Sequence, residues 1–286
     1  MATTAGDLIE LRPVRPEDRA RVEEIAQGVW DGHDYLPEVF DEWVSDPASA
    51  FQAAELEGIV VGLQRTRPLA PGLAWYEGLR VDAAHRRQGI ARAMLRSAVE
   101  EARGQGVREL RLRTGGEDAA ALFESEGFEL RLRAVAWRAS RLEGEEPARI
   151  PDPAEAEQLA GRLRGDGSFE RYGGVHLDAD GDRDLDAGEL RRLAELGRLR
   201  AGPGGRALAV VRQNRRGTRL WAGFVSGQGG VLRDLLLALR IEADIDGLEG
   251  VNAWLPADDP RAGTLEEVGY DFRIEPFSMS LYALRL

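Results

Sequence analysis

The sequence predicts an α/β (α+β) fold, in which helices flank a mixed central sheet, and it predicts that this fold occurs twice. Apolar residues in the first half follow a period of two in some segments and a period near 3.6 in others, the patterns of strands and helices. Strands and helices mixed in this order favour one central sheet. Near the C-terminus, EVGYDFRIEPFSMSLYAL resembles the earlier ESEGFELRLRAVAWRAS. This echo indicates a duplicated domain.

The first half supplies the elements in order. Runs of β-branched and other apolar residues between glycines, prolines and acidic turns predict strands at 8–12, 50–56, 59–66, 74–81, 109–114 and 128–138. Amphipathic stretches predict helices at about 16–28, 89–105 and 117–126. Between the first helix and the second strand lies the polar and aromatic segment VWDGHDYLPEVFDEWVSDP, to which we assign no helix or strand.

The second half repeats part of this order. A helix at 232–242 and a strand at 251–255 correspond to the helix at 91–102 and the strand at 109–113. The polar, proline-containing RLEGEEPARIPDPAE is the natural boundary, so we expect domains at 1–145 and 146–286. The second copy is expected to be degenerate.

Composition narrows the function classes. The 286 residues contain no cysteine, which excludes disulfides, thiolate catalysis and sulfur-based zinc sites. The net charge of −12 disfavours nucleic acid as a partner and suits a cationic small molecule. There is no apolar run of about 18 residues, and MATTAGDLIELRP does not resemble a secretory signal. We expect a cytoplasmic protein without a membrane segment, and both a monomer and a homodimer remain open.

The stretch EGLRVDAAHRRQGIARAML at 77–95 is the most informative. A strand ends at Val81, a polar turn follows, and Gly89 opens an amphipathic helix. Backbone amides at a helix start have no internal partners and carry partial positive charge. Gly89 and the small Ala91 would let a phosphate approach that backbone closely. The residues alone leave two interpretations open, an anion site or basic side chains that simply face solvent.

The motif RRQGIA at 86–91 resembles the R/Q-x-x-G-x-G/A signature of the GNAT N-acetyltransferase superfamily, and AAALFESEGF at 119–128 is similar to its A-x-x-x-Y-x-x-x-G-F segment. The resemblance covers residues 5–140 and implies acetyl-CoA as cosubstrate. It implies that the backbone of Leu79, Arg80 and Val81 pairs with the pantetheine arm, and that Phe123 lies near it. The residues implied to cradle the pyrophosphate are Arg86, Arg87, Gln88, Gly89, Ile90, Ala91 and Arg92.

A narrower likeness concerns the acceptor. The segment GVWDGHDYLP at 28–37, with Trp43 and Asp46-Pro47 after it, is similar to the same region of histidine N-acetyltransferase and its relatives. The likeness implies that an amine acceptor, of which an amino acid is one candidate, approaches near His33, Asp34 and Tyr35. The alternative is that these side chains pack a loop against the sheet.

The implied reaction transfers an acetyl group to a primary amine of a small molecule. We expect Glu77 to act as general base, directly or through water, because it lies two residues before Leu79 on the implied pantetheine strand. Its alternative role is an ion pair with an arginine. Where the superfamily usually has a tyrosine that protonates the thiolate, this chain has Phe123, and Tyr76 is the candidate substitute. The Phe123 replacement also supports a second hypothesis, a non-catalytic regulatory protein that binds acyl-CoA.

The stretch DADGDRDLDAGE at 178–189 resembles an EF-hand calcium loop in its acids but not in its scaffold. Arg183 occupies the sixth position, where glycine is required, and no entering helix is expected. Asp186 and Glu189 instead suit the start of a helix, with Asp186 as N-cap. A calcium site and a solvated acidic turn both stay open, the former also as a third function. Its candidate ligands are Asp178, Asp180, Asp182, Asp184 and Glu189.

Overall fold

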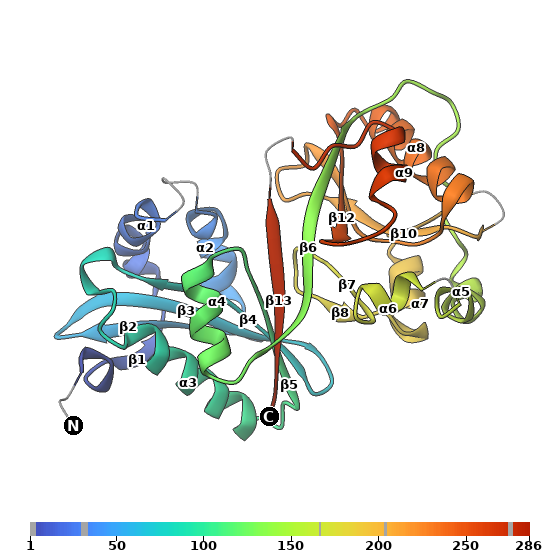
Figure 1. Ribbon diagram of the computed structural model, residues 1–286. Coiled ribbons are helices and arrows are strands. Elements are labelled where there is room, and N and C mark those ends of the chain that lie inside the picture. The colour runs from blue at the N-terminus through green and yellow to red at the C-terminus, as the bar shows by residue number, and fades with distance from the viewer. Residues whose placement is uncertain (1–3, 30–33, 166, 203–204, 274–276) are drawn as a thin grey trace. The chain divides into compact units, whose positions relative to one another are not determined.

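The computed structural model describes all residues except 1–3, 30–33, 166, 203–204 and 274–276 (Figure 1). The chain forms two compact units, one of residues 1–129 together with 282–286 and the other of residues 130–281. The boundary therefore falls at the start of a strand, before the polar linker, and the last residues of the chain return to the first unit. Among the described residues, no helix has both the length and the apolar character needed to cross a bilayer.

Unit 1 contains a mixed sheet and four α-helices. The strands that follow one another in the sheet are β1 (Glu10–Pro13), β2 (Ala50–Leu56), β3 (Ile59–Ala70), β4 (Leu73–Val81) and β5 (Glu109–Thr114). The helices are α1 (Arg19–Gln27), α2 (Leu36–Ser45), α3 (Ile90–Gly104) and α4 (Glu117–Ser125), with short 3₁₀ turns η1 (Ala5–Asp7), η2 (Pro16–Asp18) and η4 (Ala83–His85). Among these five strands, β1 to β4 pair antiparallel in sequence, while β4 and β5 pair in parallel through the crossover helix α3.

Helices cover both faces of the unit 1 sheet (Figure 1). Apolar residues of α1 and α2, including Ile25, Phe40 and Trp43, pack against Phe51 and Leu63 of the sheet. The opposite face carries α3 and α4 on a core of β4 and β5 side chains, which includes Tyr282 from the C-terminal strand. The presence of α2 corrects the sequence interpretation, which assigned no helix or strand to this segment.

Unit 2 repeats the order of strands and helices. Its sheet runs β6 (Glu129–Ser140), β12 (Gly250–Pro256), β11 (Arg219–Val225), β10 (Leu208–Gln213) and β9 (Leu199–Ala201). The last strand, β13 (Ser278–Arg285), begins in unit 2, and its residues from Tyr282 belong to unit 1. A two-stranded ribbon is formed by β7 (Val175–His176) and β8 (Arg183–Asp184). The helices are η5 (Pro153–Glu155), α5 (Ala156–Leu163), α6 (Ser168–Arg171), α7 (Ala187–Glu195), α8 (Gly229–Ile245) and α9 (Ala262–Glu267).

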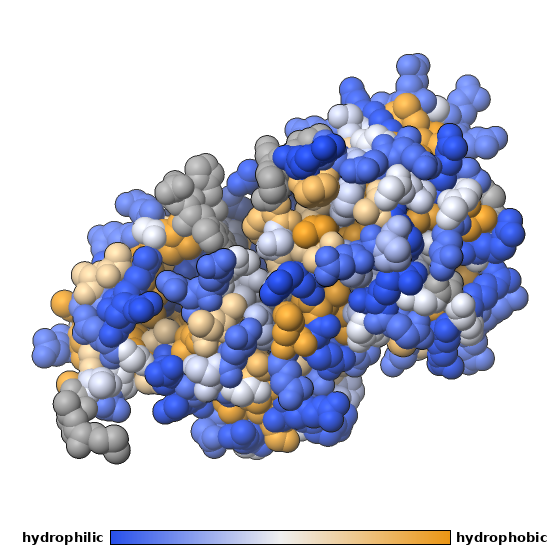
Figure 2. Space-filling model, viewed as in Figure 1, coloured by the Kyte–Doolittle hydropathy of each residue, from blue (hydrophilic) through white to orange (hydrophobic). Residues whose placement is uncertain are grey.

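The correspondence between the units lies in the crossover. In unit 2, β11, α8 and β12 form a parallel strand-helix-strand unit, as β4, α3 and β5 do in unit 1. Four leucines of α8, namely Leu232, Leu235, Leu236 and Leu239, are fully buried in the core against this sheet. On the face seen in Figure 2, charged and polar side chains predominate and apolar residues are scattered in small patches. Because the two parallel strand-helix-strand units correspond, we compare them below in the search for a functional site.

Candidate active site

A β-bulge at Gly78 interrupts β4. Between the partners Leu63–Arg80 and Arg65–Glu77, β3 advances two residues while β4 advances three. Gly78 absorbs the extra residue at φ +71°, in the left-handed region that favours glycine. The bulge puts Glu77 and Arg80 on the α2 face of the sheet, while Leu79 packs on the α3 side.

The pairing of β4 with β5 ends before this bulge. Their parallel pairing covers Leu73 to Trp75 of β4 and ends at Trp75–Arg111, although both strands are described to their last residues. The remaining segments, 76–81 of β4 and 112–114 of β5, form what we call the open strand edge. Backbone polar groups along such an edge require a partner. An extended ligand with amide groups can supply one by adding to the edge as a strand would.

The N-terminus of α3 follows the open strand edge directly. Gly89 is the N-cap residue at φ +84°, and no described side chain caps the helix. The amides of its first turn are therefore available to an anion. Arg87 has a positive φ of 64°, a conformation that costs a non-glycine residue energy and is often found at functional loops.

The predicted phosphate-binding side chains have different contacts. The Arg86 guanidinium donates to the carbonyls of Val81 and Gly28, both at 3.1 Å, so it ties the loop to its surroundings. The side chain of Arg87 is 85% exposed. Arg92 forms an ion pair with Glu126 at 2.7 Å and remains half exposed. Gln88 donates to the carbonyl of Ala84 at 3.3 Å. Ile90 is buried, so it can offer a ligand only its backbone.

Glu77 lies beside two arginines of β3 that the sequence interpretation did not single out. Its Oε1 accepts from Nη1 of Arg65 and Nε of Arg67, each at 2.9 Å, and only a tenth of the side chain is exposed. Its Oε2 has no hydrogen-bond donor among the described residues. Arg65 is itself buried and also binds Asp46. Glu77 thus forms the ion pair of the alternative interpretation, while one carboxylate oxygen stays available.

The predicted acceptor residues lie on the same face of the sheet. Asp34 accepts from Nε and Nη2 of Arg80 at 2.7 and 3.0 Å, and its side chain is 1% exposed. Burial opposes the charge of Arg80, but Asp34 keeps the pKa of Arg80 above its ordinary value. Tyr35 stacks edge-on to the buried Trp43, and the Arg80 guanidinium lies 5.5 Å from the Tyr35 ring centre. Packing and ion pairing therefore fix Asp34 and Tyr35, whereas His33 lies outside the described residues.

The other face of the site is aromatic. Phe123 is buried against Tyr76, with ring centres 6.3 Å apart, and against Tyr282 at 6.4 Å. Tyr76 donates its hydroxyl to Gln64 at 3.0 Å, and burial raises the pKa of Tyr76 well above its usual value. Tyr282, which the sequence interpretation missed, donates to Glu124 at 2.8 Å. Only the C-terminal echo in the sequence could have linked this strand to the first half.

In unit 2 the edge that corresponds to the open strand edge is closed. Pairing of β11 with β12 ends at Ala222–Ala253. The Tyr172 hydroxyl then accepts from the amide of Val225 at 3.3 Å and donates to the carbonyl of Trp254 at 2.5 Å, so it bridges the two strands. Tyr172 is fully buried. The carbonyl of Val225 accepts from Arg261 at 2.6 Å. Side chains of unit 2 therefore occupy the backbone groups that a ligand would need.

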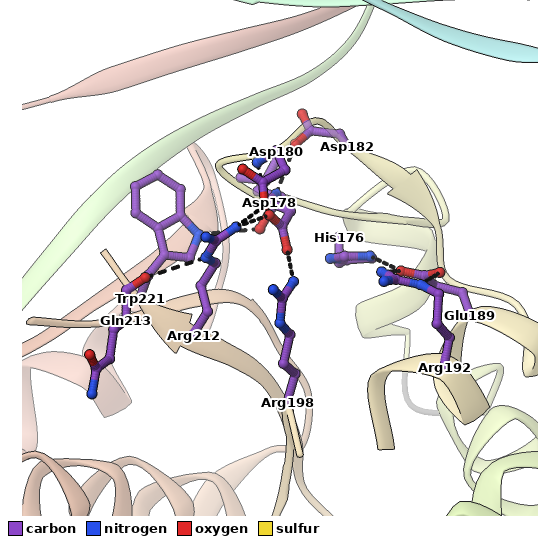
Figure 3. A network of polar contacts seen from close by, with 11 residues as sticks. His176, Asp178, Asp180, Asp182, Glu189, Arg192, Arg198, Arg212, Gln213 and Trp221 are labelled. Atoms are coloured by element: carbon purple, nitrogen blue, oxygen red, sulfur yellow. Dashed lines mark hydrogen bonds and ion pairs between the residues drawn. The ribbon is translucent and has the colours of Figure 1, made fainter. Parts of the chain in front are cut away.

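The acidic loop of unit 2 takes part in a network of ion pairs and hydrogen bonds (Figure 3). Among the described residues, no three acidic or histidine side chains are placed to hold a metal. Asp178 accepts from Arg212 at 2.7 Å and from Arg198 at 3.2 Å. Glu189 accepts from His176 at 2.8 Å and from Arg192 at 2.6 Å.

The remaining candidate ligands also have other roles. Asp180 binds Arg212, Asp182 accepts from the amide of Asp178, and Asp184 belongs to β8. Arginines thus neutralise Asp178, Asp180 and Glu189, and among the described residues the predicted ligand set of Asp178, Asp180, Asp182, Asp184 and Glu189 does not come together as a metal-binding group. The N-cap prediction is confirmed, since Asp186 accepts from the amide of Glu189 at 2.8 Å.

Comparison with known proteins agrees with this geometry. The model of the Acetyltransferase (GNAT) family matches residues 18–128. The chain is 33% identical over 121 residues to the N-alpha-acetyltransferase RimI of Mycobacterium tuberculosis, a match that covers 39% of this chain and 73% of that protein. It is 36% identical over 100 residues to human N-acetyltransferase 8, covering 32% of this chain. The chain belongs to the GNAT acetyltransferase family, although it spans only 44% of the length of human N-acetyltransferase 8.

Solved structures confirm the predicted fold class. A GCN5-related N-acetyltransferase from Sphaerobacter thermophilus aligns over 98% of this chain and 96% of its own, with a TM-score of 0.61 and 13% identity. A tandem GNAT protein from the clavulanic acid biosynthesis pathway aligns over 97% and 98%, with a TM-score of 0.57 and 15% identity. The duplicated fold is thus confirmed, and the narrower likeness to histidine N-acetyltransferase stays a prediction.

Proposed function

We propose that this protein is an acetyl-CoA-dependent N-acetyltransferase whose reaction takes place in unit 1. The observation that carries the proposal is the open strand edge of β4 and β5, which leads directly to the uncapped start of α3. The edge would pair with the amide-containing pantetheine arm, and the helix start, with Arg87 and Arg92 beside it, would hold the pyrophosphate. Acetyl-CoA would supply the thioester carbonyl that the amine attacks.

The acceptor we propose is a primary amine of a small molecule. The name N-alpha-acetyltransferase, which belongs to the RimI relative, favours an α-amine such as that of an amino acid. The acceptor would enter on the face of the sheet that carries Asp34, Tyr35 and Glu77. Specificity depends on loops that fold similarity does not define, so the family does not select one amine.

Glu77 is the proposed general base. Its Oε2 would accept the amine proton, directly or through a water, while Arg65 and Arg67 hold Oε1 and fix the carboxylate. The backbone amides next to the Gly78 bulge would stabilise the negative charge that develops on the thioester oxygen. A thiol has a pKa of about 8.5, so the CoA thiolate can leave without a side chain that donates a proton to it. The predicted role of Tyr76 as proton donor would require its hydroxyl to turn away from Gln64.

The test is release of CoA thiol with a panel of amino acids, polyamines and short peptides. We expect turnover with at least one amine, and a decrease of about 10²–10⁴ in kcat/KM for Glu77→Gln. Glu109→Gln is the matched control, because Glu109 also binds an arginine of the same sheet, Arg111, but lies before the strands diverge. An unchanged rate in Glu77→Gln would exclude this base.

A second candidate, a non-catalytic acyl-CoA-binding protein, is favoured by two observations. Phe123 has no hydroxyl, and Glu77 is held by two arginines. The same panel separates the candidates. Tight binding of acetyl-CoA without thiol release in the presence of any amine would support the second candidate and contradict the first.

A further inference from the structure

The N-terminal turn of the chain contacts the proposed phosphate loop. Residues Ala5–Asp7 form the 3₁₀ turn η1, which packs against the start of α3. Asp7 fixes this turn, because its Oδ2 accepts from the backbone amide of Thr4 at 2.7 Å and from the Thr4 hydroxyl at 2.9 Å. Ala5 packs on the apolar cluster of Ile90 and Met94. The turn is therefore attached to α3 through both its backbone and a side chain.

Gly6 makes the contact that bears on the loop. Its amide donates to the carbonyl of Gln88 at 3.1 Å. In a trans peptide, the carbonyl of one residue and the amide of the next point in opposite directions. The bond from Gly6 therefore directs the amide of Gly89 away from the N-terminal turn. This amide belongs to the uncapped helix start that we propose for the pyrophosphate.

No larger residue fits at this point. A Cβ on Gly6 would lie 2.7 Å from the carbonyl oxygen and 2.8 Å from the carbonyl carbon of Gly89, which are backbone atoms with no side-chain freedom. That same oxygen accepts the first intrahelical bond of α3, from Ala93 at 3.0 Å. A methyl group at residue 6 would thus shift both the loop and the first turn of the helix.

We propose that Gly6 is a positioning residue for acetyl-CoA. The turn at 4–7 then belongs to the binding site, although it contacts the phosphate loop on the side opposite to the one that the Gly89 amide faces. The inference rests on the proposed function. It predicts a selective effect, because the turn acts on the amides assigned to the pyrophosphate and not on the open strand edge assigned to the pantetheine arm.

The test compares Gly6→Ala with Gly104→Ala by calorimetric titration of acetyl-CoA and by kinetics. Gly104 ends the same helix, and a Cβ there would meet nothing within 4 Å. We expect the Kd and KM for acetyl-CoA to rise about tenfold in Gly6→Ala, the effect of losing one hydrogen bond to a charged group. The Gly104→Ala values should match those of the unsubstituted protein.

Acetyl-pantetheine, which lacks the pyrophosphate and the nucleotide, is the second probe. Its kcat/KM should be the same in Gly6→Ala and in the unsubstituted protein, whereas a merely structural defect would lower it for both probes. If Gly6→Ala does not fold, Asp7→Ala is the alternative variant, because it loosens the turn without a steric clash. It should also raise the Kd for acetyl-CoA.

Two outcomes would overturn the inference in different ways. If the unsubstituted protein binds acetyl-CoA and the folded Gly6→Ala binds it equally well, the role of Gly6 is wrong and the proposed function stands. If the unsubstituted protein binds no acetyl-CoA, both the proposed function and the role of Gly6 are wrong.

Discussion

Replacing Gly78 with alanine should destabilise unit 1 by about 2–4 kcal/mol, and two separate effects contribute. At φ +71° an alanine has left-handed strain of about 1–2 kcal/mol, partly offset by the lower entropy of its unfolded chain. Its Cβ would also lie 2.8 Å from Cζ3 of Trp43, which is 1% exposed and cannot move aside, and such overpacking costs about 1–3 kcal/mol.

Urea unfolding followed by tryptophan fluorescence measures this loss, and Gly58→Ala separates the two effects. Gly58 has φ +81° in the β2–β3 turn, and a Cβ there would meet nothing within 4 Å. Gly58→Ala should therefore lose only about 1 kcal/mol. Trp43→Phe, which removes Cζ3 and its neighbours, should partly rescue Gly78→Ala in a double-mutant cycle. Equal losses in the two glycine variants would refute the argument that Trp43 confines the bulge.

Three other predictions concern charge and stoichiometry. Asp34→Asn should cost about 3–5 kcal/mol in urea unfolding, because it removes the negative charge that compensates the buried Arg80 guanidinium. Asp41→Asn, at a pair whose acid is 85% exposed, should cost less than about 1 kcal/mol, and equal losses would contradict this reasoning. Calorimetry should find one acetyl-CoA per chain, because Tyr172 and Arg261 occupy backbone groups of the corresponding edge in unit 2, and a value of two in the unsubstituted protein would contradict the closed edge. Burial opposes the charge of Glu189, but its neighbours lower the pKa of Glu189 to about 2. The stability that this carboxylate contributes above pH 4.5 should therefore disappear as the pH falls toward 2. Over this pH range, urea midpoints should fall less in Glu189→Gln than in the unsubstituted protein.

Much of the fold could be predicted because its signals are local. The strand and helix periods around the crossover are carried by consecutive residues, and α3 begins where Gly89 indicated. The missed helix α2 also had a signal. Leu36, Val39, Phe40 and Trp43 follow helical spacing, and Pro37 suits the first turn of a helix, but the segment was interpreted by its polar and aromatic composition.

The candidate site also contains one part that local signals could predict and another that depends on segments far apart in the sequence. The helix start after Gly89 could be predicted from consecutive residues, whereas the role of Arg86 to Arg92 in holding a phosphate was implied by the family resemblance and stays a prediction. The partners of Glu77 could not be predicted, because Arg65 and Arg67 meet it only through the register of β3 with β4, and the bulge shifts that register. The calcium prediction failed for the same reason. It considered the acids of one loop, whereas Arg198 and Arg212, which neutralise Asp178, come from later in the chain.

The two crossovers show how one fold can give one binding edge and one closed edge. Both pairs of parallel strands diverge after a few paired residues. In unit 2, backbone groups beyond the paired residues have a side-chain partner, since the Tyr172 hydroxyl bridges Val225 and Trp254. Buried backbone groups need such partners, so this closure stabilises unit 2 without a ligand. In unit 1 the paired region ends at Trp75–Arg111, and along the open strand edge the carbonyls of Leu79 and Val81 accept from Arg80 and Arg86. A ligand that binds this edge should therefore stabilise unit 1 by about 2.7 kcal/mol at a hundred times its Kd, and leave the intrinsic stability of unit 2 unchanged.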